Sequence, residues 1–220
     1  MIDTNVLLAW GAAYRKLLPG EILFKEQTHC HFYYQVVSGQ LRWTNVDDDG
    51  SEYLQGLVNA GECIGELPLF DDEPYAATAI ANNEVTVLFL EKTTFLKLLQ
   101  EQPQIHFQFS KLLTQRLRFK FHMLKSLARH NPDKIIRSVL EYFNHTGNHK
   151  CNVCHKILLT RKQIAEMTSL RVETVIRVMR RLEANREVSI SRGKVYLGAD
   201  GCCKKESCPV DALLNFTGNG

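Results

Sequence analysis

The segment Thr160–Leu182 (TRKQIAEMTSLRVETVIRVMRRL) restricts the fold of this chain more than any other segment. Thr160 and Gln163 match a capping box, which predicts that a short helix begins there. A second helix follows after a tight corner. Four apolar residues of that second helix have the spacing of one buried stripe: Val175, Val178, Met179 and Leu182.

The opposite side of the second helix carries groups that can read DNA bases. Arg bonds bidentately to guanine, Glu accepts from cytosine, and Val or Ile contacts a thymine methyl group. The two helices therefore predict a helix-turn-helix whose second helix enters a major groove. The residues predicted to contact DNA are Arg161, Lys162, Arg171, Val172, Glu173, Thr174, Ile176, Arg177 and Arg180.

The charge distribution agrees with this prediction. Residues 1–131 contain 12 Lys and Arg against 15 Asp and Glu, a balance of −3, whereas residues 132–220 contain 15 against 9, a balance of +6. The C-terminal part is thus suited to a polyanion. The sequence has no phosphate-binding glycine loop, nucleophile elbow or HExxH motif, so we expect no enzyme. Without a long apolar run or a signal-like N-terminus, we expect a cytoplasmic protein and no membrane partner.

The N-terminal part alternates short apolar runs with glycines, from about Tyr14 to Leu90. This pattern predicts short antiparallel strands in a roll or barrel. A helix of some 25 residues follows, from Ile105 to about Arg129, and a new helix starts at Asn131-Pro132 and runs to about Tyr142 or Phe143. After the helix pair, the segments 187–191 and 194–197 predict a two-stranded wing around Arg192-Gly193.

The long helix has more apolar residues than one buried face needs. One stripe contains Ile105, Phe109, Leu112, Phe119 and Met123, and a second contains Leu113, Leu117, Leu124 and Leu127. Two stripes are typical of a helix that packs on its own domain and on a second copy of itself. The alternative is that both stripes are buried within one monomer.

Three features in this order resemble the cyclic-AMP receptor protein and fumarate–nitrate reductase regulator (CRP/FNR) family of bacterial transcription factors. They are the roll with its cassette-like run Gly65-Glu66-Leu67-Pro68-Leu69-Phe70, the long helix, and the run Val172-Glu173-Thr174-Val175-Ile176-Arg177. The last run is close to the Val-Glu-Thr-x-x-Arg signature of the fumarate–nitrate branch. The resemblance covers about residues 14–197.

This resemblance implies an α+β protein with an N-terminal antiparallel β-roll of the cyclic-nucleotide-binding type, a long dimerisation helix and a C-terminal winged helix-turn-helix. It implies a homodimer that binds an inverted-repeat operator in double-stranded DNA and contacts RNA polymerase. Glu173 and Arg177 match the base-reading residues of the family, and Arg161 matches a further position used on DNA. The expected domains are 1–104 (sensor roll), 105–131 (dimerisation helix and hinge) and 132–220 (winged helix with a Cys-containing tail).

The sequence departs from the cyclic-nucleotide binders of the family. The effector pocket implied by the resemblance contains Gly65, Glu66, Leu67, Ala76 and Ala77, and Ala76 and Ala77 replace the Arg and hydroxyl residue that hold the cyclic phosphate. A buried phosphate would there lose charge-assisted bonds worth about 1.5–3 kcal/mol each. We therefore expect that the roll does not bind cyclic AMP in the usual way. The alternative is a cyclic-nucleotide-binding signal module with secondary DNA binding.

Five of the seven cysteines lie in the C-terminal part. Cys151 and Cys154 have the spacing of half a zinc site, which Cys203 and Cys208 would complete. Zinc, an iron–sulfur centre and free thiols all remain open from the sequence.

Overall fold

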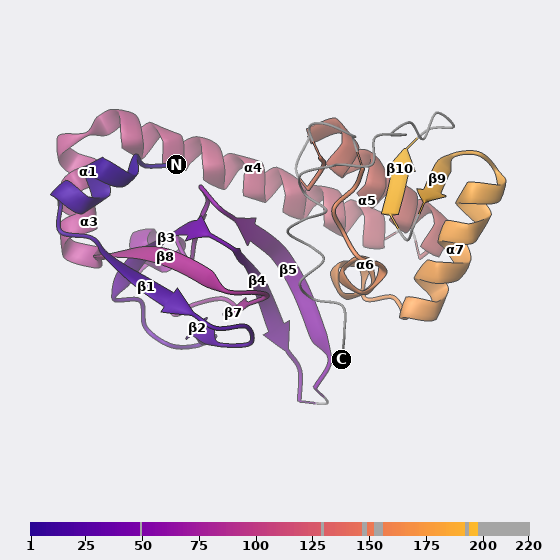
Figure 1. Ribbon diagram of the computed structural model, residues 1–220, viewed down its shortest axis with the longest axis horizontal. Helices are drawn as coiled ribbons and strands as arrows, with labels where there is room; N and C mark the ends of the chain where they lie inside the picture. The colour runs from indigo at the N-terminus through magenta and orange to yellow at the C-terminus, as the bar shows by residue number, and fades with distance from the viewer. Residues whose placement is uncertain (49, 129, 147–148, 152–155, 192–193, 198–220) are drawn as a thin grey trace. The chain divides into compact units, whose positions relative to one another are not determined.

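The computed structural model describes residues 1–220 except 49, 129, 147–148, 152–155, 192–193 and 198–220. The chain forms two compact units, Met1–Phe119 and Lys120–Gly220. The elements can be followed along the chain in Figure 1. None of the helices in the described ranges combines the length and apolarity needed to cross a membrane.

The first unit contains two antiparallel sheets of four strands each among the described residues. The order in one sheet is β1 (Ala13–Leu17), β8 (Val85–Glu91), β3 (Phe32–Ser38) and β6 (Cys63–Ile64). The order in the other is β2 (Ile22–Phe24), β7 (Thr78–Ala81), β4 (Gln40–Val46) and β5 (Glu52–Asn59). The chain changes sheet between β3 and β4 at Gly39, which has φ +83° and would place a Cβ 2.3 Å from the Glu84 carbonyl oxygen. Only glycine fits this turn.

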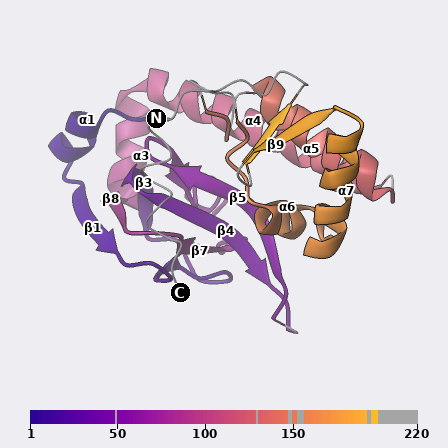
Figure 2. The same ribbon diagram turned by 45° about the vertical axis from the view of Figure 1, so that its right-hand side comes forward.

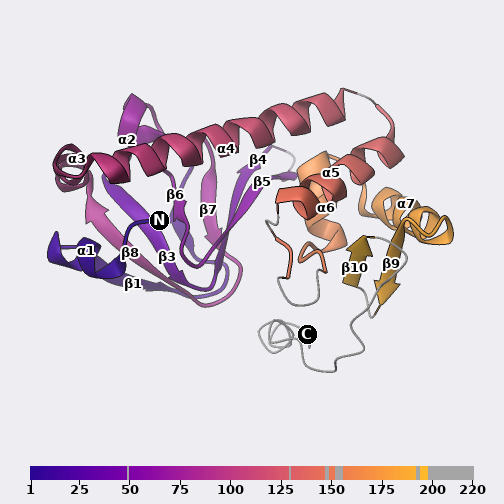
Figure 3. The same cartoon turned by 90° about the horizontal axis from the view of Figure 1, so that it is seen from above.

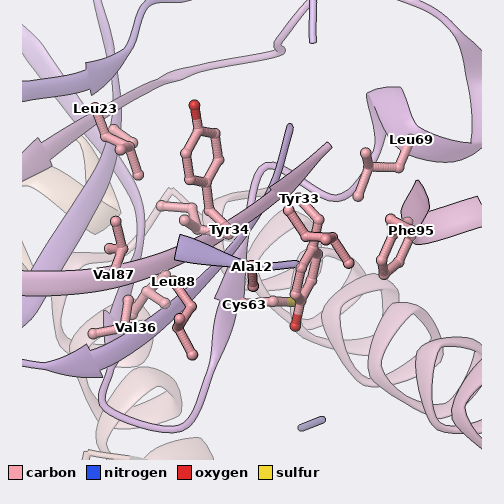
Figure 4. Close-up of a cluster of buried hydrophobic side chains, with 14 of the residues drawn as sticks. Ala12, Leu23, Tyr33, Tyr34, Val36, Cys63, Leu69, Val87, Leu88 and Phe95 are labelled. Carbon is pink, nitrogen blue, oxygen red and sulfur yellow. The ribbon is translucent and has the colours of Figure 1, made fainter. Parts of the chain in front are cut away.

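The core of the first unit lies between these sheets and the helices that follow β8. Val36 of β3 faces Val87 of β8 in register, and both are fully buried. Figure 4 shows these side chains together with Tyr33, Cys63 and Phe95. Tyr33 stacks on Phe95 of α3 with ring centroids 4.6 Å apart, so aromatic packing joins the sheet to the helices.

In the described part of this unit, four helices lie wholly or partly within it: α1 (Thr4–Ala9), α2 (Pro68–Asp71), α3 (Lys92–Glu101) and α4 (Pro103–Leu127). The segment before α1 is held by Gln35, whose side chain donates to the Ile2 carbonyl (2.9 Å) and accepts from the Ile2 amide (3.1 Å). Helix α4 is the predicted long helix, and it is continuous over its 25 residues (Figure 3).

The second unit contains α5 (Pro132–Thr146), α6 (Arg161–Thr168), α7 (Val172–Ala184) and the hairpin of β9 (Val188–Ser191) and β10 (Lys194–Leu197). Asn131 caps α5 by accepting from the amides of Asp133 (3.0 Å) and Lys134 (3.2 Å), as its sequence predicted. Helix α5 ends at Thr146, a turn beyond the predicted end. The antiparallel roll, the long helix and the winged helix pair confirm the predicted α+β fold.

Candidate nucleic-acid interface and effector site

The start of α6 is fixed by the predicted capping box. The Gln163 amide donates to Thr160 Oγ1 (3.1 Å), and the Thr160 amide donates to Gln163 Oε1 (2.8 Å). Helix α6 ends at Ser169, which has φ +53° in the left-handed region. This residue produces the tight corner before α7, and the helix pair can be followed in Figure 2.

Helix α7 is anchored by the predicted apolar stripe. Val175, Val178, Met179 and Leu182 are all buried, with exposed fractions of 1% or less. At its start, the Arg171 side chain makes no capping hydrogen bond. An uncapped helix loses about 1 kcal/mol relative to one with a Ser or Asn cap. The stripe therefore holds α7 in place without help from its first turn.

Ion pairs fix the orientation of α7 and the wing. Arg181 donates to both Asp133 oxygens, from Nε (2.8 Å) and from Nη2 (2.6 Å), which ties α7 to the start of α5. The guanidinium of Arg137 pairs with Glu187 at the start of the wing. The Ile190 amide of β9 donates to Glu183 (3.1 Å). The bidentate pair of Arg181 with Asp133 fixes the geometry of the contact as well as stabilising it.

The opposite face of α7 carries exposed, unpaired charges. Glu173, Arg177 and Arg180 are exposed. In the described part of this unit the ion pairs join other residues, namely Arg137–Glu187, Lys162–Glu166 and Arg181–Asp133. Glu173 and Arg177 therefore have no ionic partner there. A carboxylate and a guanidinium one turn apart are thus available to a ligand.

The structure places the other predicted contact residues on the same helix pair. Arg171 and Lys162 are exposed, and Arg161, Val172, Thr174 and Ile176 are partly exposed. Lys162 lies 3.5 Å from Glu166, one turn along α6. The wing tip at Arg192-Gly193 lies outside the described residues.

The predicted effector region contains a buried ion pair that joins the roll to α4. Glu66 follows β6 and is fully buried, and its carboxylate pairs with the Arg116 guanidinium. Arg116 also donates to the Cys63 carbonyl (2.6 Å) and lies 5.7 Å from the Trp43 ring centre. Burial alone would lower the pKa of Arg116, but the Glu66 carboxylate raises it, so the guanidinium stays charged.

Aromatic side chains pack around Gly65. Phe24 and Tyr75 stack with ring centroids 3.8 Å apart. A Cβ on Gly65, which has φ +71°, would come within 2.7–2.8 Å of these two rings. Gly65 is therefore required by close packing as well as by its backbone conformation.

The two alanines of the predicted pocket differ in their exposure to solvent. Ala77 is buried, whereas Ala76 is exposed, and the Ala76 carbonyl accepts from Asn45 Nδ2 (2.8 Å). Neither side chain can form a hydrogen bond. Leu67 is partly exposed. The structure thus brings Glu66 and Gly65 to the interior and leaves Ala76 at the surface.

Sequence reasoning missed Arg116 as a member of this site. The burial of Arg116 could have been predicted, because this residue lies on the helical stripe of Phe109, Leu112, Phe119 and Met123. A charged residue within a buried stripe needs a buried partner. The partner is distant in sequence, so only the tertiary fold identifies Glu66.

Helix α4 carries a second apolar stripe that is exposed to solvent in the monomer. Phe107, Leu117, Phe121 and Leu124 have exposed fractions of 61%, 56%, 62% and 66%. With Ser110 and Thr114 they occupy the a and d positions of a heptad pattern, 107–114–121 and 110–117–124. The predicted second stripe was partly wrong, because Leu113 and Leu127 are partly buried and the two phenylalanines were not included.

Of the four predicted metal ligands, Cys151 alone lies within the described residues. Cys151 is buried and has no disulfide. Cys154, Cys203 and Cys208 lie outside the described residues. Among the described residues, no three His, Cys, Asp or Glu side chains are grouped as a metal site would require.

Comparison with known proteins agrees with both parts of this description. Residues 14–102 match the family described as "Cyclic nucleotide-binding domain". Over 219 residues the chain is 26% identical to the anaerobic regulatory protein of Bacillus subtilis, covering 95% of this chain and 91% of that protein. A shorter match, 31% identical over 99 residues, is to lysophospholipase nte1 of Neurospora crassa, of whose length it covers only 6%.

Among solved structures, the c-di-GMP-responsive global regulator CLP of Xanthomonas campestris has a similar fold. The TM-score is 0.71 at 18% identity, covering 89% of this chain and 98% of that chain. The relative from Bacillus subtilis and the structural neighbour from Xanthomonas campestris are both named as regulators. The chain is similar to transcription regulators of the CRP/FNR family.

Proposed function

We propose that this protein is a homodimeric regulator that binds specific DNA sequences through α7. The observation that carries the proposal is the two-sided α7, whose apolar stripe is locked in the fold while Glu173 and Arg177 are exposed and have no described ionic partner. Arg161, Lys162, Arg171 and Arg180 would contact phosphates and fix the register on the duplex. RNA polymerase would be the further partner, in the cytoplasm.

The exposed stripe of α4 supports the dimer. Four large apolar side chains at heptad positions cost free energy in water and would be buried against the same stripe of a second copy. Such a contact is isologous, so it relates the two α7 helices by a two-fold axis. An operator with inverted half-sites follows from that symmetry.

For the roll, we propose an effector other than cyclic AMP, or none. Ala76 and Ala77 supply no side-chain donor for a phosphate. The one guanidinium described beside Glu66 is that of Arg116, and the Glu66 carboxylate already neutralises it. An incoming anion would have to compete with a buried carboxylate for the same cation.

Selection of bound duplexes from a random pool tests the proposal. We expect enrichment of an inverted repeat whose half-site contains a G·C pair read by Arg177. Recovery of unrelated sequences would contradict sequence-specific binding. The same pool also separates a regulator from a protein that only dimerises.

The alternative is a signal module whose roll binds a cyclic nucleotide, which the match of residues 14–102 favours. Calorimetric titration with cyclic AMP separates the two. We expect no heat of binding in the micromolar range. Tight binding would contradict the argument from Ala76 and Ala77, without affecting the argument from α7.

A further inference from the structure

A closed circuit of hydrogen bonds joins the last turns of α4 to α5 within the second unit. Ser126 Oγ donates to the His122 carbonyl one turn earlier on α4 (2.8 Å). Ser126 Oγ and Ser138 Oγ of α5 are 2.9 Å apart. His122 Nε2 lies 3.0 Å from both Ser138 Oγ and the Ser138 carbonyl oxygen.

The directions of these bonds follow from the chemistry of the groups. A carbonyl oxygen only accepts, so the single Ser126 hydroxyl proton is used on His122. Ser138 must then donate to Ser126, because Ser126 has no second proton. The Ser138 oxygens are left as acceptors for His122. His122 Nε2 therefore carries a proton, and each member of the circuit donates to the next.

The two serines of the circuit are buried, and His122 is partly exposed and contacts an aromatic ring. Ser126 and Ser138 have exposed fractions of 1% and 8%. The His122 ring lies over Tyr142 of α5 with centroids 4.7 Å apart. A buried hydroxyl group without a hydrogen-bond partner costs free energy. Removing one member of the circuit leaves another member unpaired, so the contact between α4 and α5 is weakened.

We infer that His122 is a positioning residue for DNA binding, and this inference rests on the proposed function. The circuit fixes α5 against the end of α4, and α7 is fixed to α5 through Arg181 and Asp133. Two hydrogen-bonded contacts therefore connect α4, the proposed dimerisation helix, to α7, the proposed recognition helix. The first is the circuit between α4 and α5, and the second is the pair of Asp133 with Arg181 between α5 and α7. His122 sets the separation and angle of the two recognition helices rather than the contacts of either one.

The spacing between half-sites measures this role directly. Each inserted base pair rotates one half-site by about 35° and moves it along the duplex axis. A protein with a rigid joint discriminates against such an insertion, and one with a loosened joint tolerates it. Affinity for a single half-site does not depend on the joint.

The experiment uses the full chain and the inverted repeat obtained by selection, with and without one inserted base pair. His122→Phe keeps a ring over Tyr142 but removes the Nε2 donor, and Ser138→Ala removes one hydroxyl. We expect both to reduce the preference for the original spacing roughly fivefold, the size expected for one lost hydrogen bond. Affinity for a single half-site stays within about twofold of the unmodified protein.

Two further variants complete the design. His122→Gln places an N–H at the same position and should restore the spacing preference. Thr146→Ala removes a hydroxyl that bonds the Tyr142 carbonyl (2.9 Å) on α5 outside the circuit, so it should leave the preference unchanged.

An unchanged spacing preference in both His122→Phe and Ser138→Ala would overturn the inference, as would equal losses in His122→Phe and His122→Gln. If His122→Phe does not fold, Ser138→Ala decides alone. If the unmodified protein binds one half-site as tightly as the inverted repeat, the proposed dimer is wrong, and the role inferred for His122 is wrong with it.

Discussion

At the scale of single residues, one buried ion pair joins the interior of the roll to α4. Glu66 is fully buried, and Arg116 compensates it from α4. Such pairs contribute little net stability compared with apolar side chains, but breaking one is costly because a charge is left buried. The pair therefore specifies how α4 lies on the roll more than it stabilises the roll.

Arg116→Gln should lower the free energy of unfolding by about 3–5 kcal/mol, because the Glu66 carboxylate loses its cation. Adding Glu66→Gln to the same protein should recover most of that loss. Urea denaturation followed by fluorescence measures both values. The matched control is Arg118→Gln on the exposed side of α4. A single variant as stable as the control would show that Glu66 needs no partner.

His149 should make the second unit sensitive to acid. Its burial lowers the pKa from the ordinary value of 6.5 to about 4. The unfolded chain binds this proton below about pH 6.5 and the folded chain only below about pH 4, so stability falls as the pH drops through that window. Above it, the contribution is fully present.

His149→Asn removes the titrating group and suits the left-handed backbone there, where φ is +50°. Unfolding free energies at about pH 7 and about pH 4.5 should differ less in this variant than in the unmodified protein. His145→Asn, at an exposed position, is the control. Identical pH dependence in all three proteins would exclude His149 as the cause.

At the scale of elements, α4 has one buried face and one exposed apolar face. The face with Phe109 and Met123 is buried within the chain, and the face with Leu117 and Phe121 is exposed. In the heptad pattern, Leu117 and Phe121 occupy d and a positions, whereas Phe109 and Met123 occupy c positions. The c positions lie roughly opposite the a and d positions, so the two faces lie on opposite sides of the helix. A helix of this kind is stable against the roll and still has an apolar surface to bury.

Leu117→Lys should disrupt self-association. In a two-fold contact Leu117 lies near its own counterpart, so two lysines would meet, and like charges in contact cost several kcal/mol, roughly a hundredfold in affinity. Sedimentation equilibrium measures the change. Gln115→Lys adds the same charge beside the stripe and should leave the dimer intact. Equal weakening by both substitutions would point to net charge rather than to the stripe.

Local patterns in the sequence predicted the elements well. The capping box of α6, the Asn131 cap of α5 and the buried stripe of α7 depend on residues within two turns of one another, so spacing alone reveals them. The pairing of Arg116 with Glu66 and of Gln35 with Ile2 was not predictable, because each joins residues far apart in the chain. The exposed phenylalanines of α4 were missed for a related reason: an amphipathic pattern shows that two faces exist but not which face the fold covers.

At the scale of the whole molecule, the proposed dimer presents its positive charges in pairs. Arg161, Lys162, Arg171 and Arg180 would give about eight phosphate contacts per dimer, and hence a slope of roughly −7 for the logarithm of affinity against the logarithm of salt. Fluorescence anisotropy over a salt series measures it. Arg180→Gln should reduce the slope by about 2 and weaken all sequences alike. A slope near zero would contradict the proposed interface.

Duplex selection with Arg177→Ala and Glu173→Ala, run beside the unmodified protein, tests whether the exposed face of α7 reads bases. We expect the unmodified protein to enrich an inverted repeat. Each variant should bind that site about 1–3 kcal/mol more weakly and lose preference at one base pair, placed symmetrically in the two half-sites. Unchanged motifs, or equal losses on random DNA, would show that α7 does not read sequence through these side chains.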